Sequence, residues 1–193
     1  MKKYSLFVLF LAFTTLLSAQ KDETLFSATG IRLTGAWGGP IIGGTLVDGN
    51  IVRQSGSIFA LEFNKNLTVG WSSTSVDYPR VSSGRVDFSY NGPFLNYAPA
   101  AHKAVHTSFG MMVSGGRFGL EVQDNKDKSD IWVAQPHAGV EFNVFRWMKA
   151  QLLGGYRFGF FVGDGFDGVS DSDISEPFVS LSLKFGFSWG ATN

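Results

Sequence analysis

The residues from Val179 to Trp189 alternate strictly between apolar and polar types. The odd positions are Val179, Leu181, Leu183, Phe185, Phe187 and Trp189, and only Ser, Lys and Gly stand between them. A period of two residues is that of a β-strand with one apolar face, and it excludes an amphipathic helix. The 24 Gly, 19 Phe, 5 Tyr and 5 Trp also favour turn-rich β structure. The pattern predicts an all-β fold.

The same alternation recurs along the chain and predicts eight strands. They cover residues 30–47, 51–63, 67–76, 84–96, 104–123, 131–144, 148–162 and 177–189. Within 104–123 the apolar phase changes after Val113, and we attribute the change to a β-bulge at Gly115-Gly116. An even number of strands allows an antiparallel up-and-down barrel to close.

Each predicted strand has an apolar face without Lys, Arg, Asp or Glu. On residues 84–96 this face is expected to comprise Val86, Phe88, Tyr90, Gly92 and Phe94. The opposite faces place seven charged residues in the lumen: Glu62, Arg85, Asp87, Glu141, Lys149, Arg157 and Lys184. An eight-stranded barrel is just wide enough to be filled by side chains. A paired network that plugs the lumen is therefore expected, with a narrow gated pore as the alternative.

Strand length and connections favour a membrane barrel over a soluble one. Most strands run 10 to 14 residues, whereas a tilted membrane-crossing strand needs about 9 to 11. Short connections at 64–66, 97–103 and 145–147 alternate with more polar ones at 77–83, 124–130 and 163–176. Aromatic residues stand at both rims, with Trp132, Phe160, Phe161 and Phe178 on the polar-loop side. The alternative is a secreted soluble β-sandwich or lipocalin-like binder.

Residues 1–19 are predicted to be a signal peptide, which leaves 20–193 as the barrel domain. Lys2 and Lys3 precede an apolar run that starts at Leu6 and is too short to span a bilayer. Removing the peptide leaves 14 basic and 16 acidic residues. This balance argues against a nucleic-acid partner. The lack of cysteine excludes disulfides, thiolate metal sites and cysteine nucleophiles.

Three features of the sequence are candidates for functional sites. His106 and Ser108 have the His-x-Ser spacing of a nucleophile with its base, but their phase places them in the lumen. His137 also faces inward and is interpreted as a member of the charged network. The acidic segment from Asp164 to Glu176 has the oxygen ligands that Ca²⁺ prefers, without the order of an EF-hand. We predict no catalytic, cofactor-binding or metal-binding residues, and no enzyme.

The chain resembles the small eight-stranded outer-membrane β-barrel proteins of Gram-negative bacteria, the OmpA/OmpX-like class. The residues that carry the resemblance are the exported start, the alternating strands, and a final strand Lys184-Phe185-Gly186-Phe187-Ser188-Trp189 similar to the C-terminal signal of that class. The resemblance implies a porin-like integral protein of the cell envelope in contact with lipid and lipopolysaccharide, inserted by the barrel assembly machinery. It implies a structural or surface-interaction role through the loops. The alternative in that class is a lipid-modifying enzyme like the lipid A deacylases.

Overall fold

In the computed structural model, the residues described are 30–47, 50–81, 84–122, 125–162 and 170–189. The chain divides into two units, residues 1–32 and residues 33–193. In the first unit only Gly30, Ile31 and Arg32 are described, and all three are exposed. The predicted signal peptide lies outside the described residues. The second unit contains every strand that the structure describes.

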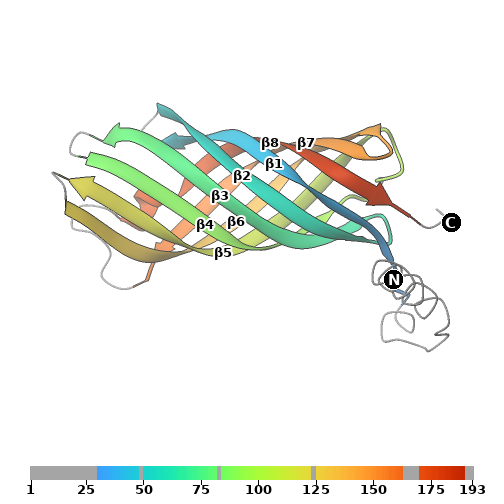
Figure 1. The fold of residues 1–193 in the computed structure, drawn as a ribbon, viewed down its shortest axis with the longest axis horizontal. Coiled ribbons are helices and arrows are strands. Elements are labelled where there is room, and N and C mark those ends of the chain that lie inside the picture. The colour runs from blue at the N-terminus through green and yellow to red at the C-terminus, as the bar shows by residue number, and fades with distance from the viewer. Residues whose placement is uncertain (1–29, 48–49, 82–83, 123–124, 163–169, 190–193) are drawn as a thin grey trace, which may run out of the picture. The chain divides into compact units, whose positions relative to one another are not determined.

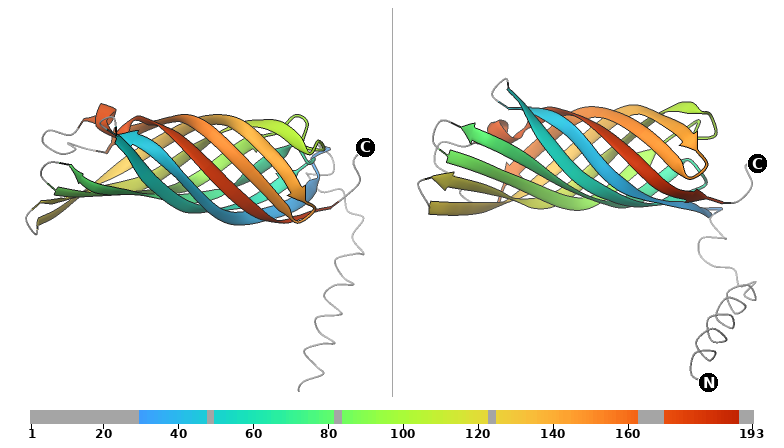
Figure 2. Two further views of the ribbon diagram at one scale, coloured as in Figure 1. Left: turned by 90° about the horizontal axis from the view of Figure 1, so that it is seen from above. Right: turned by 45° about the horizontal axis from the view of Figure 1, so that its top comes forward.

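Residues 33–193 form a closed antiparallel barrel (Figures 1 and 2). The strands are β1 (Leu33–Val47), β2 (Asn50–Phe63), β3 (Leu67–Val81), β4 (Gly84–Tyr97), β5 (Val105–Val122), β6 (Asn125–Phe145), β7 (Met148–Phe161) and β8 (Glu176–Ser188). Each strand pairs with the next, and β8 pairs with β1. A short 3₁₀ helix, η1 (Asp171–Ile174), precedes β8. The predicted all-β, eight-stranded up-and-down barrel is confirmed.

The two ends of the barrel have different connections. At one end, here called the turn end, the connections are residues 64–66, 98–104 and 146–147. Asn64 and Lys65 have positive φ angles of 49° and 64°, as both central residues of a type I′ hairpin turn do. Asn66 N donates to Phe63 O at 3.2 Å and closes this turn. The tight hairpins predicted at Asn64–Asn66 and Phe145–Trp147 are therefore confirmed.

At the opposite end, here called the loop end, two strands run further than the sequence pattern predicts. β3 continues to Val81 and β6 begins at Asn125, so most of the polar connections expected at 77–83 and 124–130 are strand. Val122 pairs directly with Asn125. Paired strands are held together by backbone hydrogen bonds, which do not require apolar and polar side chains to alternate. A hairpin can therefore extend beyond the residues that show this alternation. Figures 1 and 2 show the β3–β4 and β5–β6 hairpins extending at this end.

The strands are tilted, which can be read from their pairing. A row of paired residues that starts at Gly35 on β1 passes through Glu62, Thr68, Asn96, Gly110, His137, Gly155 and Phe178. It returns to β1 at Thr45, ten residues nearer the loop end. This stagger is the shear of the barrel. Every row therefore rises toward the loop end as it passes from β1 to β8.

The inward and outward faces agree with the sequence pattern on β2, β3, β6, β7 and β8, but β4 is reversed. Phe88, Tyr90 and Phe94 point into the barrel and are buried, whereas Asp87 and Ser89 are exposed on the outside. Alternation defines two faces without stating which one is outside. Near the loop end the lumen is packed with apolar side chains, so the apolar face of β4 lies inside.

Four aromatic residues outside β4 also differ from their predicted positions. The pairing of β5 with β4 and with β6 continues without interruption through Gly115 and Gly116, so the expected bulge is absent there. Phe118 consequently points inward. Phe178 and Phe161, both expected at the outer rim, face the lumen, where Phe161 packs against Phe118. On β1 a register shift between Leu33 and Gly35 turns Trp37 into the lumen. Trp132 and Phe160 remain on the outer surface, as predicted.

At some inward-facing glycines the backbone of the neighbouring strand lies too close to leave room for a side chain. A Cβ on Gly139 would lie 1.9 Å from Leu152 O and 2.9 Å from Leu153 Cα, which are backbone atoms of β7. A Cβ on Gly154, which lies on β7, would have its nearest atom 3.9 Å away. The first position excludes a side chain, and the second accommodates one.

We expect Gly139→Ala to lower the free energy of unfolding by about 1–3 kcal/mol, because the added methyl group must displace a neighbouring strand. Gly154→Ala is the matched control and should change it by less than about 0.5 kcal/mol. Urea titration in detergent, followed by tryptophan fluorescence, measures both values. Equal effects of the two substitutions would contradict the close approach at Gly139.

Candidate functional site

A group of buried charged side chains crosses the lumen near the turn end. Lys149 Nζ lies 2.8 Å from Glu62 Oε2 and 3.3 Å from Glu141 Oε1. Lys184 Nζ donates to Glu141 Oε2 at 2.6 Å. All four residues are less than 9% exposed. Two carboxylates and two ammonium groups therefore form one connected set, here called the ionic network.

Other side chains complete the hydrogen bonding of the two carboxylates. Glu62 accepts hydrogen bonds from Trp37 Nε1 at 3.0 Å and from Ser188 Oγ. The Lys149 ammonium also lies 4.3 Å from the centre of the Trp37 ring. His106 Nε2 lies 3.3 Å from Glu141 Oε1, and its Nδ1 lies 3.1 Å from Lys103 O. Buried charges are tolerated when they are paired and hydrogen-bonded in this way.

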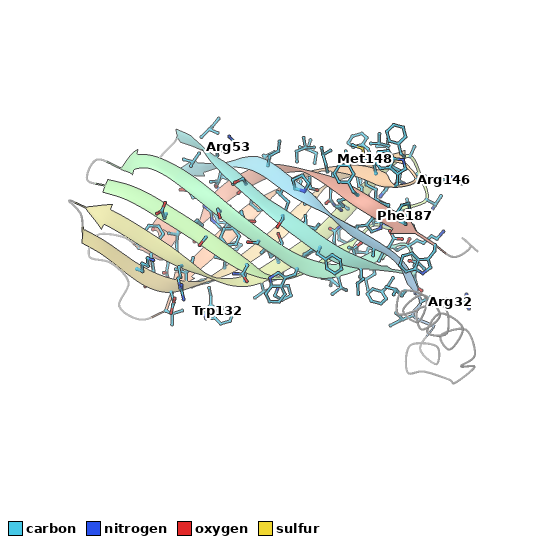
Figure 3. The ribbon with its side chains drawn as sticks, viewed as in Figure 1. Arg32, Arg53, Trp132, Arg146, Met148 and Phe187 are labelled. Atoms are coloured by element: carbon cyan, nitrogen blue, oxygen red, sulfur yellow. The ribbon has the colours of Figure 1, made fainter. Side chains whose placement is uncertain are left out.

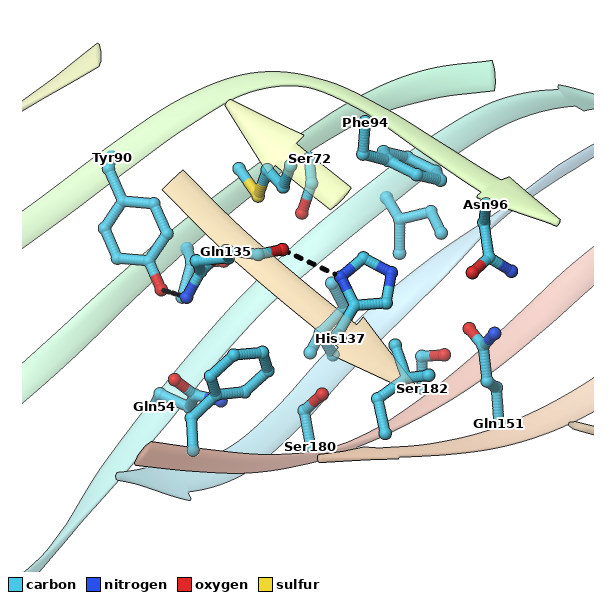
Figure 4. Close-up of a pocket in the computed structure, with 16 residues that line it drawn as sticks. Gln54, Ser72, Tyr90, Phe94, Asn96, Gln135, His137, Gln151, Ser180 and Ser182 are labelled. Atoms are coloured by element: carbon cyan, nitrogen blue, oxygen red, sulfur yellow. Dashed lines mark hydrogen bonds between the residues drawn. The ribbon is translucent and has the colours of Figure 1, made fainter. Parts of the chain in front are cut away.

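A small cavity of about 70 Å³ lies in the middle of the barrel (Figure 4). Amide and hydroxyl side chains line part of it, together with Tyr90 and His137. The rest of the wall is apolar and comprises Ile41, Ile58, Phe94, Met112, Leu153 and Phe178. Gln135 Nε2 donates to Tyr90 OH at 3.0 Å, and His137 Nδ1 lies 3.1 Å from Gln135 O. Three buried atoms of the lining, Gln54 Oε1, Asn96 Oδ1 and Ser182 Oγ, have no hydrogen-bond partner among the described residues. A cavity of this size with unpaired polar atoms in its wall has room for water.

The loop end of the lumen is closed by apolar packing. The cluster comprises Val52, Ile58, Ala60, Val76, Phe88, Tyr90, Phe94, Met112, Phe118, Ile131, Val133 and Ile174. Phe118 packs against Phe88 and edge-on against Phe161, with ring centroids 6.1 and 5.5 Å apart. Ile174 belongs to η1, so this helix closes one side of the cluster. The lumen is therefore polar at one end and apolar at the other.

Arg157 attaches η1 to the barrel wall. It is 1% exposed, and its Nε donates to Ile174 O at 3.1 Å. Nη2 lies 3.4 Å from Thr45 Oγ1, and the guanidinium lies 4.7 Å from the centre of the Phe88 ring. Arg157 thus belongs to the apolar end and not to the ionic network. Its position explains why η1 lies over this part of the lumen.

The structure brings together four of the seven charges predicted for the lumen. Glu62, Glu141, Lys149 and Lys184 form the ionic network, and Arg157 is buried elsewhere. Asp87 is a correction, since it lies on the outer surface. The side chain of Arg85 lies outside the described part of the structure. His137 faces inward as predicted, but it lines the cavity and takes no part in the network.

His106 and Ser108 are buried in the lumen, as their phase predicts, but they form no nucleophile–base pair. Ser108 Oγ accepts a hydrogen bond from Gln151 Nε2 at 2.9 Å, while His106 contacts Glu141. A lipid-modifying site would need both side chains on the outer face. The arrangement therefore gives no support to the deacylase alternative.

The acidic segment from Asp164 to Glu176 is only partly described. Residues 163–169 lie outside the described part of the structure. Asp171 Oδ1 accepts a hydrogen bond from Phe161 N at 2.9 Å, so this carboxylate holds η1 against β7. Among the described residues no group of three or more His, Asp or Glu side chains is placed to hold a metal ion. Within the same residues no helix is long and apolar enough to cross a membrane.

Sequence reasoning missed several residues that shape the lumen. The sequence pattern places the apolar residues Trp37, Phe88, Phe118 and Phe178 on the outer face, whereas the structure buries all four in the lumen. Trp37 in particular donates to Glu62 and belongs to the environment of the ionic network. The sequence contains one indication of this. If the alternation of β5 continues without a bulge, Phe118 faces inward and Arg117 faces outward. Arg117 does lie outside, 3.6 Å from Asp130.

We expect Glu141→Gln to lower the free energy of unfolding by about 3–5 kcal/mol, because it leaves Lys184 buried without a carboxylate. The double variant Glu141→Gln/Lys184→Met should cost less than the sum of the two single substitutions. Arg117→Gln breaks an exposed ion pair and serves as the control, with an expected change below about 1 kcal/mol. Urea titration in detergent measures all four variants. Strict additivity would show that Glu141 and Lys184 do not interact.

The sequence matches no protein-family model and no curated protein. Several solved structures match, and two of them are described here. Neisserial surface protein A is 13% identical, with a TM-score of 0.55, and the match covers 83% of this chain and 99% of that chain. Ail, the attachment invasion locus protein of Yersinia pestis, is 13% identical, with a TM-score of 0.51, and the match covers 82% and 100%. These matches confirm the resemblance at the level of the fold: the chain is an eight-stranded, closed antiparallel barrel of the kind found in Neisserial surface protein A and Ail.

Proposed function

We propose that this chain is a non-enzymatic integral barrel of the outer membrane, with a plugged lumen and a structural or surface-interaction role. The observation that carries the proposal is the exposure of large apolar side chains around the barrel. Phe187 is 69% exposed, Phe59 61% and Trp132 57%. A soluble monomer seldom exposes a continuous apolar surface of this extent. Such a surface is suited to contact with the hydrocarbon interior of a membrane.

The packing of the lumen supports a closed barrel over a pore. The ionic network fills the turn end, and the apolar cluster fills the loop end. The cavity of about 70 Å³ lies between them. A water-filled channel would need a continuous polar path, and the aromatic packing of Phe88, Phe118 and Phe161 interrupts it.

The extended hairpins support a surface role. β3–β4 and β5–β6 continue beyond the apolar band at the loop end, and their outward residues there include the exposed Asp87, Arg117, Lys128 and Asp130. Charged hairpins on a stable barrel suit contact with molecules outside the cell. One structural neighbour is named as an attachment invasion locus protein. We propose surface contact as the role of these hairpins here.

Cell fractionation and gel mobility test the location of the protein. We expect it in the outer-membrane fraction, and an unboiled sample should migrate differently from a boiled one because the closed barrel resists detergent. The loss of residues 1–19 should be visible by mass spectrometry of the mature chain. A monomer that is soluble without detergent would instead support the lipocalin-like alternative.

The plugged lumen is tested by reconstitution into planar bilayers. We expect no steps in current above the baseline, because both ends of the lumen are packed. The control is the same protein boiled before addition, which distinguishes channel currents from leakage caused by detergent. A reproducible, ion-conducting open state would contradict the plug and favour the narrow-pore alternative.

Shortening the β5–β6 hairpin tests the surface role. We expect that replacing residues 119–128 by a two-residue Asn-Gly turn leaves the barrel folded, because the deleted pairs lie beyond the apolar band. Adherence of bacteria that express the variant to cultured cells or to extracellular matrix should fall to the level of an empty vector. A variant that folds and adheres normally would exclude this hairpin as the contact surface.

A further inference from the structure

The accessible charges at the turn end of the barrel have one sign only. Each of the three connections there carries one basic residue, and these are Lys65, Lys103 and Arg146, here called the basic rim. Lys103 and Arg146 are exposed, and Lys65 is half-buried. Among the described residues of this end the acids are Glu62 and Glu141, and both are buried in the ionic network.

The loop end has a surface of mixed charge by comparison. Its exposed charged residues include Arg53, Arg117, Lys128, Asp87, Asp130 and Asp171. Arg117 lies 3.6 Å from Asp130, so part of this charge is paired. No side chain of the basic rim forms an ion pair with another described residue. The rim is therefore a concentration of positive charge that the described part of the barrel does not balance, and such a concentration attracts anions.

Hydrogen bonds join the three connections that carry the basic rim. Ala98 N donates to Asn66 O at 2.8 Å, which joins the first connection to the second. Asn143 Nδ2 donates to Lys103 O at 2.8 Å, which joins the second connection to the end of β6. That strand leads directly into the turn with Arg146. The three basic residues therefore stand on one continuous arc of the turn end.

The aromatic residues beside Arg146 give the depth of the rim. The rings of Phe145 and Trp147 are stacked with their centroids 5.3 Å apart, and the Trp147 ring is 6.2 Å from that of Phe185. All three residues are exposed. Figure 3 shows Arg146 and Met148 at the same end of the barrel. Aromatic residues of membrane barrels gather where the hydrocarbon meets the polar headgroups. Arg146 is therefore placed at the depth of lipid phosphates.

We propose that the basic rim binds anionic phospholipids of the leaflet around the turn end. The proposal rests on the membrane location stated under the proposed function. Short turns of outer-membrane barrels face the periplasm, so this is the periplasmic leaflet.

The chemistry of the basic rim fits lipid phosphates. Arginine binds a phosphate through two parallel N–H groups, and lysine binds it as a point charge. Basic side chains beside a membrane surface favour anionic lipids over neutral ones. Their apolar stems lie against hydrocarbon while the charged groups reach the phosphates. An acidic polymer of the cell wall fits less well, because Arg146 stands between two aromatic rings that face the bilayer.

Native mass spectrometry of the folded barrel tests the lipid preference. The protein is equilibrated in detergent with equal amounts of phosphatidylglycerol, which is anionic, and phosphatidylcholine, which has no net charge. We expect several-fold more phosphatidylglycerol than phosphatidylcholine to remain bound. The variant Lys65→Gln/Lys103→Gln/Arg146→Gln should bring this ratio close to one. The matched control removes three positive charges from the loop end and should keep the preference; it is Arg53→Gln/Arg117→Gln/Lys128→Gln.

Equal retention of the two lipids by the unaltered protein overturns the proposal, and so does an equal loss of preference in the two triple variants. Sedimentation with purified peptidoglycan that the turn-end variant loses, without any lipid preference, assigns the rim to the cell wall and also overturns it. Raising the salt concentration should lower the preference, because salt screens the attraction between charges.

Gel mobility without boiling shows which variants are folded. Arg146→Gln alone should lower the ratio part of the way, and it replaces the triple variant if that variant does not fold. A folded membrane barrel without a lipid preference removes only this inference. A protein that is monomeric and soluble without detergent removes the proposed function as well.

Discussion

Burial of two carboxylates and two ammonium groups in one network is the constraint on which the rest of the barrel depends. Glu62, Glu141, Lys149 and Lys184 come from β2, β6, β7 and β8, and Trp37 and His106 add β1 and β5. None of these charges can stay in the lumen without its partners, because an unpaired buried charge is costly. The network therefore favours one register for six strands at once. It also explains why Ser188, at the end of β8, and Thr34, at the start of β1, both contact Glu62.

The two ends of the lumen solve the same packing problem differently. The turn end uses paired charges, and the loop end uses aromatic and aliphatic side chains like the core of a soluble protein. The stagger of ten residues that accumulates over one circuit of the barrel sets the width that both must fill. Where the two kinds of packing meet, neither fills the space, and the cavity lined by Gln54, Asn96 and Ser182 remains.

Much of the fold could be predicted from local sequence, because alternation in β6, β7 and β8 is unambiguous. Polar residues alternate with large apolar ones there, and the charged residues Glu141, Lys149 and Lys184 mark the inner face. The same rule fails on β4, where Phe88 and Tyr90 lie inside and Asp87 lies outside. Side-chain type does not distinguish lipid from an apolar lumen. Only the pairing of β4 with β3 and β5 decides which face is inside, and pairing is a property of the whole barrel.

The sequence predicts which charged residues form the candidate site, but it does not predict which residues they contact. The sequence identified the four network charges, yet it could not show that Trp37 and Ser188 bind Glu62, since these residues are 25 and 126 positions away. The sequence also does not show that Arg157 lies apart from the ionic network, because its position depends on the contact with η1 at the loop end. Contacts of this kind follow from closure of the barrel and carry no local signal.

The network also depends on the order in which the chain is made. Both carboxylates, on β2 and β6, precede both lysines, on β7 and β8. A chain that lacks its last two strands would carry two acids in its interior with no cation to balance them. Burying these unpaired carboxylates is unfavourable, so we expect such an intermediate to keep them in contact with water. The final hairpin, β7–β8, thus closes the sheet and also supplies the two cations that balance the carboxylates of the ionic network.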